Sequence, residues 1–299
     1  MPKETIIKVK TSGQIIKGVG GIYTVVTMEG EKVKCYPRGK LKQIGELFIG
    51  DIVDVSLDKE GIIEGVHKRK SQLVRPYVSN MDAIVIVLAP IPKPDMLLVD
   101  KLIIGATENN IQPIICINKA DMEGADAVAQ DVANDYKDIA DILVISTQTN
   151  QGIDILKEKM KGKFVCLAGQ SAVGKSSLIN CILGEDKLKI GEISKKSERG
   201  KNTTRHIEII SLDDETQIAD TCGFNMLEIP LFDPDRLSTY YTDFDEYAEH
   251  CKFRCCNHYK ESDCGVKRAV ESGKIAKSRY ERYAKLFEYV ESKWNRRYN

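Results

Sequence analysis

The sequence predicts a multidomain protein with a small β-barrel at the N-terminus, a central α/β domain, and a mostly α, cysteine-rich domain at the C-terminus. Short alternating stretches separated by Gly-rich or charged turns fill residues 6–66, as in small barrels. After residue 80, continuous apolar runs alternate with helical patterns, which a parallel sheet buried on both faces requires. We therefore place the domain boundaries at residues 1–70, 71–229 and 230–299.

Composition narrows the class of protein. With 299 residues, of which 42% are hydrophobic, the chain has enough apolar material for more than one core. No apolar run of roughly eighteen residues and no signal-peptide core are found, so we expect a cytoplasmic protein without a membrane span. The 44 basic and 44 acidic residues balance, which argues against a protein that coats nucleic acid indiscriminately. Basic residues gather at both ends, with 13 against 9 acidic residues in 1–70 and 13 against 6 in 252–299.

The N-terminal part is expected to form strands at residues 21–28, 31–37 and 51–58, because each stretch alternates apolar with polar residues. Residues 67–76 are rich in basic residues and end in Arg-Pro, so we interpret them as a linker.

The central part contains six apolar runs that predict strands, and the stretches between them predict helices. The strands are expected at residues 83–89, 113–118, 141–146, 163–169, 206–212 and 216–220, and the helices at 94–109, 123–136, 153–160 and 176–183. Pro230 and Pro234 then break the pattern. Residues 230–251 hold six acidic residues against Arg236, which marks a distinct connector, and a basic helical tail follows from residue 266.

The strongest motif is Gly-Gln-Ser-Ala-Val-Gly-Lys-Ser at residues 169–176, which fits the phosphate-loop pattern between a strand and a helix. Backbone amides of the loop would cradle phosphates, Lys175 would neutralise the β and γ groups, and the Ser176 hydroxyl would bind Mg²⁺. A chance Gly-containing turn is the alternative, which the flanking strand and helix disfavour. The residues assigned to nucleotide binding here are Gly169, Gln170, Ser171, Ala172, Val173, Gly174, Lys175, Ser176 and Ser177.

The base is indicated by Asn118-Lys119-Ala120-Asp121, which follows the strand at 113–118. The Asp121 carboxylate can accept both the ring N–H and the exocyclic amino group of guanine, a donor pair that adenine lacks. Asn118 would complete the base contact, and Lys119 would lay its stem along the ring. Taken alone the motif could be an ordinary loop, but the phosphate loop makes that alternative weaker. Ser146, after the next strand, is assigned to a loop that backs the base, although a Ser-Thr turn is also common there.

Two further segments predict the parts that sense the γ-phosphate. Asp220-Thr221-Cys222-Gly223 resembles a second switch, in which Asp220 would hold Mg²⁺ and the Gly223 amide would contact the γ-phosphate. The polar stretch 191–206 is the natural first switch, with Thr204, or alternatively Thr203, as a hydroxyl ligand of Mg²⁺. Lys175, Thr204 and Gly223 are therefore the candidate catalytic residues. The guanine motif precedes the phosphate loop, so the domain is predicted to be circularly permuted, which is tolerated because domain termini often lie close together.

A fourth constellation predicts a structural zinc site, one per chain, in the C-terminal domain. Cys251, Cys256, His258 and Cys264 supply three thiolates and an imidazole, a set that suits tetrahedral Zn²⁺ with no open position. The alternative is that these are free surface cysteines and a solvated histidine that bind no metal. A disulfide is disfavoured in a cytoplasmic protein. Cys255 and His250 remain alternative ligands. Other cysteines, such as Cys116 and Cys166, sit in apolar strands and are expected to be buried.

Taken together, the motif order, the barrel and the cysteine spacing closely resemble the ribosome small subunit-dependent GTPases of the RsgA (YjeQ) family. The resemblance covers nearly the whole chain. It implies an OB-fold barrel, a permuted α/β P-loop GTPase domain and a zinc domain. The implied role is late maturation of the small ribosomal subunit, with GTP hydrolysis stimulated by that subunit. We accordingly expect a monomer that binds GTP and GDP, Mg²⁺, the small subunit and its rRNA, and no membrane.

The chain departs from the family pattern in its switches. Gly-Lys-Asn-Thr-Thr at residues 200–204 stands where the family usually has Gly-Arg-His-Thr-Thr, and Cys222 replaces a proline. Phe224 occupies the position where many GTPases place a water-orienting glutamine. We expect slow intrinsic hydrolysis, accelerated when a partner orders residues 191–204. A scaffold that uses nucleotide only as a gate is an alternative, and a small-molecule kinase is disfavoured by the guanine motif.

Basic residues on the two flanking domains are candidate RNA contacts, with an ordinary solvated surface as the alternative. These residues are Arg38, Lys40 and Lys42 in the barrel, and Lys274, Lys277, Arg279, Arg282, Arg296 and Arg297 in the tail.

Overall fold

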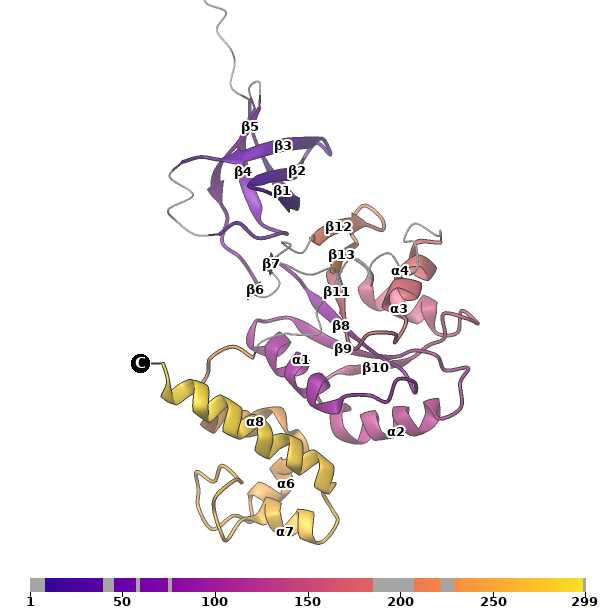
Figure 1. Cartoon of the computed structure of the whole chain (residues 1–299), viewed down its shortest axis with the longest axis vertical. Helices are drawn as coiled ribbons and strands as arrows, with labels where there is room; N and C mark the ends of the chain where they lie inside the picture. The colour runs from indigo at the N-terminus through magenta and orange to yellow at the C-terminus, as the bar shows by residue number, and fades with distance from the viewer. Residues whose placement is uncertain are drawn as a thin grey trace, which may run out of the picture.

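The computed structural model describes residues 9–39, 46–57, 60–74, 77–184, 207–221 and 229–297. Figure 1 shows three parts stacked along the long axis of the molecule: a barrel, an α/β domain, and a C-terminal domain of helices and loops. Among the described residues, no helix is long and apolar enough to cross a membrane.

The barrel consists of β1 (Val9–Val19), β2 (Ile22–Thr27), β3 (Lys32–Pro37), β4 (Ile52–Leu57) and β5 (Gly61–Val66). The pairings β1–β2, β2–β3, β3–β5, β5–β4 and β4–β1 close it, and only β3–β5 is parallel. This is the five-stranded OB topology. The expected strands at 21–28, 31–37 and 51–58 are present, whereas β1 and β5 were not predicted individually. Five side chains without exposed surface fill the interior: Ile15, Val25, Cys35, Val53 and Ile63.

The segment after the barrel is not the simple linker that the sequence suggested. β6 (Gln72–Val74) lies within it and pairs with β7 (Tyr77–Ser79) in a short antiparallel hairpin. Leu73 and Val78 face each other in this hairpin and are 3% and 0% exposed. Burial of these two side chains fixes the segment against the domain that follows.

The central sheet contains β8 (Ala83–Leu88), β9 (Gln112–Ile117), β10 (Asp141–Val144), β11 (Phe164–Ala168), β12 (Ile207–Ser211) and β13 (Gln217–Thr221). Its order is β10-β9-β8-β11-β13-β12, and every pairing is parallel except the antiparallel β12–β13. The prediction of a buried sheet is confirmed, because every residue of β8 is at most 1% exposed. Cys116 and Cys166 are fully buried as expected, and burial raises the pKa of Cys116 to about 12.

Helices cover both faces of this sheet. α1 (Met96–Glu108) and α2 (Ala125–Tyr136) share one apolar cluster with Ile84 and Ile86 of β8. α3 (Ile153–Met160) and α4 (Lys175–Leu183) share the opposite cluster with Val85 and Val87. The alternation of side chains along β8 therefore explains why helices cover both faces of the sheet. Open parallel sheets of this kind place ligand sites at the carboxyl ends of their strands.

The C-terminal domain forms its own core. It contains the 3₁₀ helices η3 (Pro234–Tyr240) and η4 (Thr242–Phe244), followed by α6 (Asp245–Ala248), α7 (Gly265–Glu271) and α8 (Lys277–Asn295). The acidic segment expected to be a connector is folded into this core, because its aromatic and aliphatic side chains are buried while its acids, apart from the half-buried Asp243, are exposed. The buried ones are Leu237, Tyr240, Tyr241 and Phe244, which cluster with Tyr283 and Phe287 of α8.

Candidate functional site

The phosphate loop runs from β11 into α4, as predicted, and its two glycines are required by close backbone approaches. Gly169 has a φ of 125°, and a Cβ there would lie 2.2 Å from the Val87 carbonyl oxygen. Gly174 has a φ of 96°, and a Cβ there would lie 2.3 Å from Asn118 Nδ2. No other residue type fits these two positions, because a side chain would meet neighbouring strands or motifs.

Lys175 is the first residue of α4 and is partly enclosed by the loop. Its Nζ donates to the carbonyl oxygens of Gly169 at 2.7 Å and Gln170 at 2.5 Å. Burial lowers the pKa of Lys175 to about 8. A phosphate group in the loop would favour the charged ammonium, because opposite charges at short range raise a lysine pKa. Ser176 and Ser177 follow in the first turn of α4, where unpaired amides favour anions.

Asn118 and Lys119 tie the guanine motif to the phosphate loop. Asn118 is fully buried; its Nδ2 donates to the Val173 carbonyl at 3.0 Å, and its Oδ1 accepts from the Thr147 amide at 3.2 Å. Lys119 has a φ of 62°, and its Nζ donates to the Ala172 carbonyl at 2.9 Å. The amide of Asn118 thus joins three loops, and its expected contact with the base stays a prediction.

Asp121 and Ser146 lie next to each other at the end of the site. The Ser146 hydroxyl donates to Asp121 Oδ1 at 2.5 Å, and its oxygen accepts from the amides of Gln148 and Thr149. Ser146 is fully buried, whereas Asp121 is exposed. The arrangement leaves a carboxylate held at one oxygen and facing solvent, which suits recognition of a donor pair on a purine.

The predicted Mg²⁺ ligands are only partly within the described residues. Ser176 lies in the first turn of α4, which follows β11, and Asp220 is the last residue but one of β13. β11 and β13 are parallel neighbours, so both positions lie at the same edge of the sheet. Two oxygen ligands at one edge fit a hydrated Mg²⁺. The backbone of Asp220 is placed, opposite Glu208 of β12. Thr204 and Gly223 lie outside the described residues, as do Lys40 and Lys42.

Four residues of the C-terminal domain could hold a metal ion. The ligand atoms of Cys251, Cys256, His258 and Cys264 all lie within 4.8 Å of one another. Cys251 and Cys264 Sγ atoms are 3.8 Å apart, and His258 Nδ1 lies 3.5 Å from the first and 3.4 Å from the second. A tetrahedral ion with ordinary Zn–S and Zn–N bonds requires edges of about 3.8 and about 3.6 Å. The spacing therefore matches a four-coordinate site.

The loop that carries these ligands is held by its surroundings. His258 has a φ of 54°, and its carbonyl accepts from the Tyr280 hydroxyl of α8 at 2.8 Å. Burial lowers the pKa of His258, which keeps the imidazole neutral, as a ligand must be. Cys255, the alternative ligand, is exposed and is not part of the cluster, and neither is His250.

Two residues predicted to contact RNA are internal instead. Arg279 is 1% exposed, and its guanidinium donates to Asp100 of α1 at 2.8 Å and to Asp243 at 3.1 Å. Arg282 donates to Asp100 at 2.8 Å and to Asp135 of α2 at 2.5 Å. The prediction is wrong for this pair because both guanidinium groups are paired with carboxylates, which join α8 to α1 and α2 of the central domain. Spacing within a basic tail cannot distinguish buried from exposed cations.

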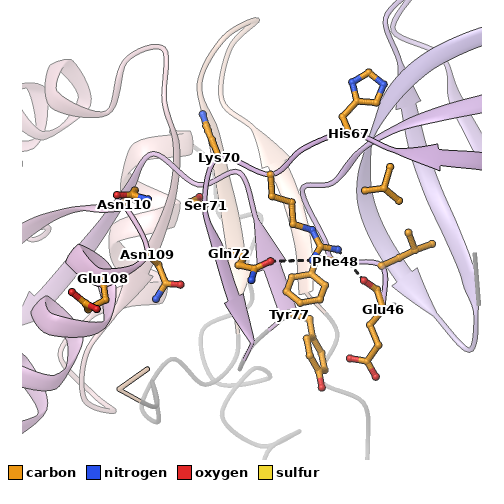
Figure 2. Close-up of a pocket in the computed structure, with 13 residues that line it drawn as sticks. Glu46, Phe48, His67, Lys70, Ser71, Gln72, Tyr77, Glu108, Asn109 and Asn110 are labelled. Atoms are coloured by element: carbon orange, nitrogen blue, oxygen red, sulfur yellow. Dashed lines mark hydrogen bonds between the residues drawn. The ribbon is translucent and has the colours of Figure 1, made fainter. Parts of the chain in front are cut away.

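A cleft that the sequence did not indicate lies between the barrel and the end of α1. It has a volume of about 820 Å³, and Figure 2 shows Phe48 and Tyr77 between Glu46 and His67 on one side and Glu108 to Asn110 on the other. Arg69 lies against the Phe48 ring, 3.8 Å from its centroid, and binds the fully buried Asp51 with its Nε at 2.7 Å. Asp51 also accepts from Ser79, so this contact joins the barrel to the hairpin.

Comparisons with known proteins agree with this arrangement. A family model described as RsgA GTPase matches residues 66–230, and one described as RsgA N-terminal domain matches residues 12–63. The small ribosomal subunit biogenesis GTPase RsgA of Caldanaerobacter subterraneus subsp. tengcongensis is 42% identical, over 97% of this chain and 99% of that protein. The RsgA of Alkaliphilus metalliredigens is 37% identical, over 96% and 100%.

Solved structures show the same fold. YjeQ from Thermotoga maritima superposes with a TM-score of 0.77 at 34% identity and covers 94% of this chain and 99% of that one. YloQ, described as a circularly permuted GTPase, superposes with a TM-score of 0.72 at 29% identity and covers 98% and 99%. The permuted order of the motifs is therefore a property of the fold.

Proposed function

The chain belongs to the RsgA GTPase family, and we propose that its GTP hydrolysis acts as a switch in late maturation of the small ribosomal subunit. The observation that supports this most strongly is that Asn118 joins the phosphate loop, the guanine motif and the Ser146 loop into one site. We propose the small ribosomal subunit as the partner because both relatives are called small ribosomal subunit biogenesis GTPases.

Within this pocket each part has a chemical task. Asp121, oriented by Ser146, would recognise guanine, and the amides of residues 169–177 would bind the phosphates. Lys175 would neutralise charge on the β and γ groups. Mg²⁺ would supply further neutralisation between those groups, and Ser176, Asp220 and Thr204 are the residues proposed to hold it, with the Gly223 amide toward the γ-phosphate.

The activating group is proposed to come from outside the chain. Phe224 follows Gly223, and its side chain has no polar atom with which to orient water. Hydrolysis would then be slow until the subunit docks and supplies or orders the missing part. Docking would occur in the cytoplasm, where a monomer meets assembling subunits. Exposed basic residues of the barrel and the tail remain the proposed rRNA contacts: Arg38, Lys274, Lys277, Arg296 and Arg297.

We assign the metal of the C-terminal cluster as one structural Zn²⁺. Three thiolates and one imidazole are soft and borderline ligands that suit zinc and leave no open position. The site would close the ligand loop over α8. We also propose residues 1–70, 71–229 and 230–299 as the barrel, GTPase and zinc domains.

Turnover of GTP with and without purified small subunits tests the proposed role. We expect stimulation that saturates with subunit concentration. If the protein bound subunits and its turnover stayed unchanged, the switch would be rejected in favour of a scaffold gated by nucleotide.

Nucleotide competition on wild type and on Asp121→Asn tests the pocket itself. The substitution replaces an acceptor oxygen by an amino donor, so preference should move from guanosine to xanthosine nucleotides. Equal binding of ATP and GTP by the wild type would contradict the assignment of the guanine motif.

A further inference from the structure

The barrel contacts the GTPase domain at the hairpin that joins the two predicted switches. β12 begins at Ile207, directly after the segment assigned to the first switch, and β13 ends with Asp220 and Thr221, where the second switch begins. Figure 1 shows β12 as the strand of the central sheet nearest the barrel. A contact on this hairpin therefore acts on the chain next to both γ-phosphate-sensing segments.

The contact is made by β1, which pairs with β12 and joins barrel and sheet into one 11-stranded sheet. Lys17 lies opposite Glu208, and its Nζ is 2.6 Å from Glu208 Oε2. Glu208 in turn lies opposite Asp220 in the β12–β13 register. Three residues away on each strand, Gln217 Nε2 of β13 donates to Gln14 Oε1 of β1 at 2.8 Å. A single row of residues thus leads from the barrel to the proposed Mg²⁺ ligand.

This contact supports a strand that would otherwise be the edge of the GTPase sheet. Edge strands are held by one neighbour only, so their register is less constrained. Ile207 and Ile209 of β12 belong to the same apolar cluster as Ile15 and Ile16 of β1. The barrel therefore constrains β12 by apolar packing and by the Lys17–Glu208 pair, and it contacts β13 directly through the hydrogen bond between Gln14 and Gln217. The register of β12 also constrains β13.

The two attachments of the barrel differ in strength. At the linker, Arg69 binds Asp51, which has no exposed surface, and such a pair resists disruption. At the hairpin, the side chains of Lys17 and Glu208 are 39% and 49% exposed, and pairs of this kind are weak. The cleft of Figure 2 lies at the linker attachment, between the barrel and the end of α1. A partner that shifts the barrel would therefore break the contact with the hairpin β12–β13 more easily than the contact with the linker.

We propose that Lys17 and Glu208 are positioning residues that connect the barrel to the Mg²⁺ end of the nucleotide site by holding β12 in register against β13. The proposal rests on the proposed role of Asp220 as a Mg²⁺ ligand. Binding of a partner to the barrel then alters the Mg²⁺-dependent part of nucleotide affinity. By thermodynamic linkage, nucleotide and Mg²⁺ alter partner affinity by the same factor.

The test measures binding of a fluorescent, non-hydrolysable GTP analogue to the full chain as Mg²⁺ is titrated. In Lys17→Glu, like charges stand opposite each other, and we expect the Mg²⁺ concentration for half-maximal binding to rise roughly two- to fivefold. GDP affinity in the presence of a chelator should stay unchanged, because it depends on the phosphate loop and the guanine motif. A general loss of fold would instead weaken the binding of GDP as well as that of the GTP analogue.

Lys10→Glu is the matched control. Lys10 is on the same strand and undergoes the same charge change, but its partner is Glu64 inside the barrel, at 3.6 Å. Lys10→Glu should leave the Mg²⁺ concentration for half-maximal binding at the wild-type value. The exchange Lys17→Glu with Glu208→Lys should restore most of the wild-type value, since the pair is then re-formed with reversed polarity.

The outcomes separate this proposal from the one it rests on. If Lys17→Glu behaved as Lys10→Glu, or if the exchange failed to restore the titration, Lys17 and Glu208 would have no positioning role, and the GTPase site would stand. If wild-type binding of the analogue were independent of Mg²⁺, the assignment of Asp220 and this inference would both be rejected.

Discussion

At the scale of single residues, Gly174 is where the phosphate loop and the guanine motif meet. An alanine at its φ of 96° would strain the backbone by about 1–3 kcal/mol and place Cβ 2.3 Å from Asn118 Nδ2. We expect Gly174→Ala to weaken GTP binding about tenfold or more in a calorimetric titration, since 1.4 kcal/mol is a factor of ten. Gly273→Ala is the control, because its φ is 75° and no atom lies within 4 Å. Equal affinity of the two variants would contradict the argument.

We expect Lys175 to make nucleotide binding depend on pH. Burial lowers its pKa to about 8, and phosphate favours the charged form, so above pH 8 binding must be accompanied by proton uptake. GDP affinity should therefore be constant below that pH and fall above it, approaching about tenfold per pH unit. Calorimetry in buffers of different ionisation enthalpy measures the proton uptake directly. Lys175→Arg should lose this uptake between pH 8 and 9, because arginine does not titrate there.

Residue assignments of this kind were predictable where a motif has local spacing. The phosphate loop and the guanine motif each occupy one short stretch next to a strand, so pattern and context sufficed. The partners of Asn118 were not predictable, because Val173 is 55 positions away and the hydrogen bond exists only once three loops converge. The contact between Ser146 and Asp121 likewise depends on neighbouring strand ends.

At the scale of elements, α1 and α8 are joined by buried charges. Asp100 accepts from Arg279, Arg282 and the Tyr136 hydroxyl, and its side chain is 2% exposed. Burial alone would lower the pKa of Arg279, but Asp100 and Asp243 hold it above its ordinary value. Removing one charge from such a cluster leaves the others uncompensated.

We expect Asp100→Asn to lower the free energy of unfolding by about 3 kcal/mol or more, because two guanidinium groups lose a buried counter-charge. Asp263→Asn removes a carboxylate from the exposed pair with Arg268 and should cost less than about 1 kcal/mol. Urea denaturation followed by circular dichroism compares the two. A similar small loss for both would show that the Asp100 cluster does not fasten α8 to α1.

Helices and strands with a clear hydrophobic pattern in the sequence were predictable, and those without such a pattern were not. The strands and helices of the central domain follow from long apolar runs and breaks between them. β5 begins at Gly61, whose Cβ would lie 2.5 Å from Cys35 Sγ, so its glycine is required by close packing although it weakens the strand pattern. The hairpin β6–β7 was hidden in a basic segment, since only its buried face, Leu73 and Val78, is informative.

At the scale of the whole molecule, the apolar cores show which parts depend on one another. The barrel shares one cluster with α1, α2 and one face of the central sheet, whereas the C-terminal domain has a separate cluster. Ile104 of α1 belongs to the C-terminal cluster, as does Ile229 at the end of the proposed GTPase domain. The nucleotide residues all lie in the central domain, so loss of metal should affect partner docking more than nucleotide binding.

Cys256→Ser and Cys255→Ser test this separation, because they remove neighbouring thiols of which only one belongs to the ligand cluster. In Cys256→Ser we expect bound zinc, measured by elemental analysis, to fall from about one ion per chain to near none, because four-coordinate sites need all their ligands. Stimulation of GTP turnover by small subunits should fall with it, while GDP affinity changes less than about twofold, since the Lys175 and Asp121 pockets have their own core. Cys255→Ser should retain zinc, stimulation and affinity. Loss of GDP binding in Cys256→Ser alone would contradict this independence and would show that the metal domain supports the nucleotide site through α1 and Asp100.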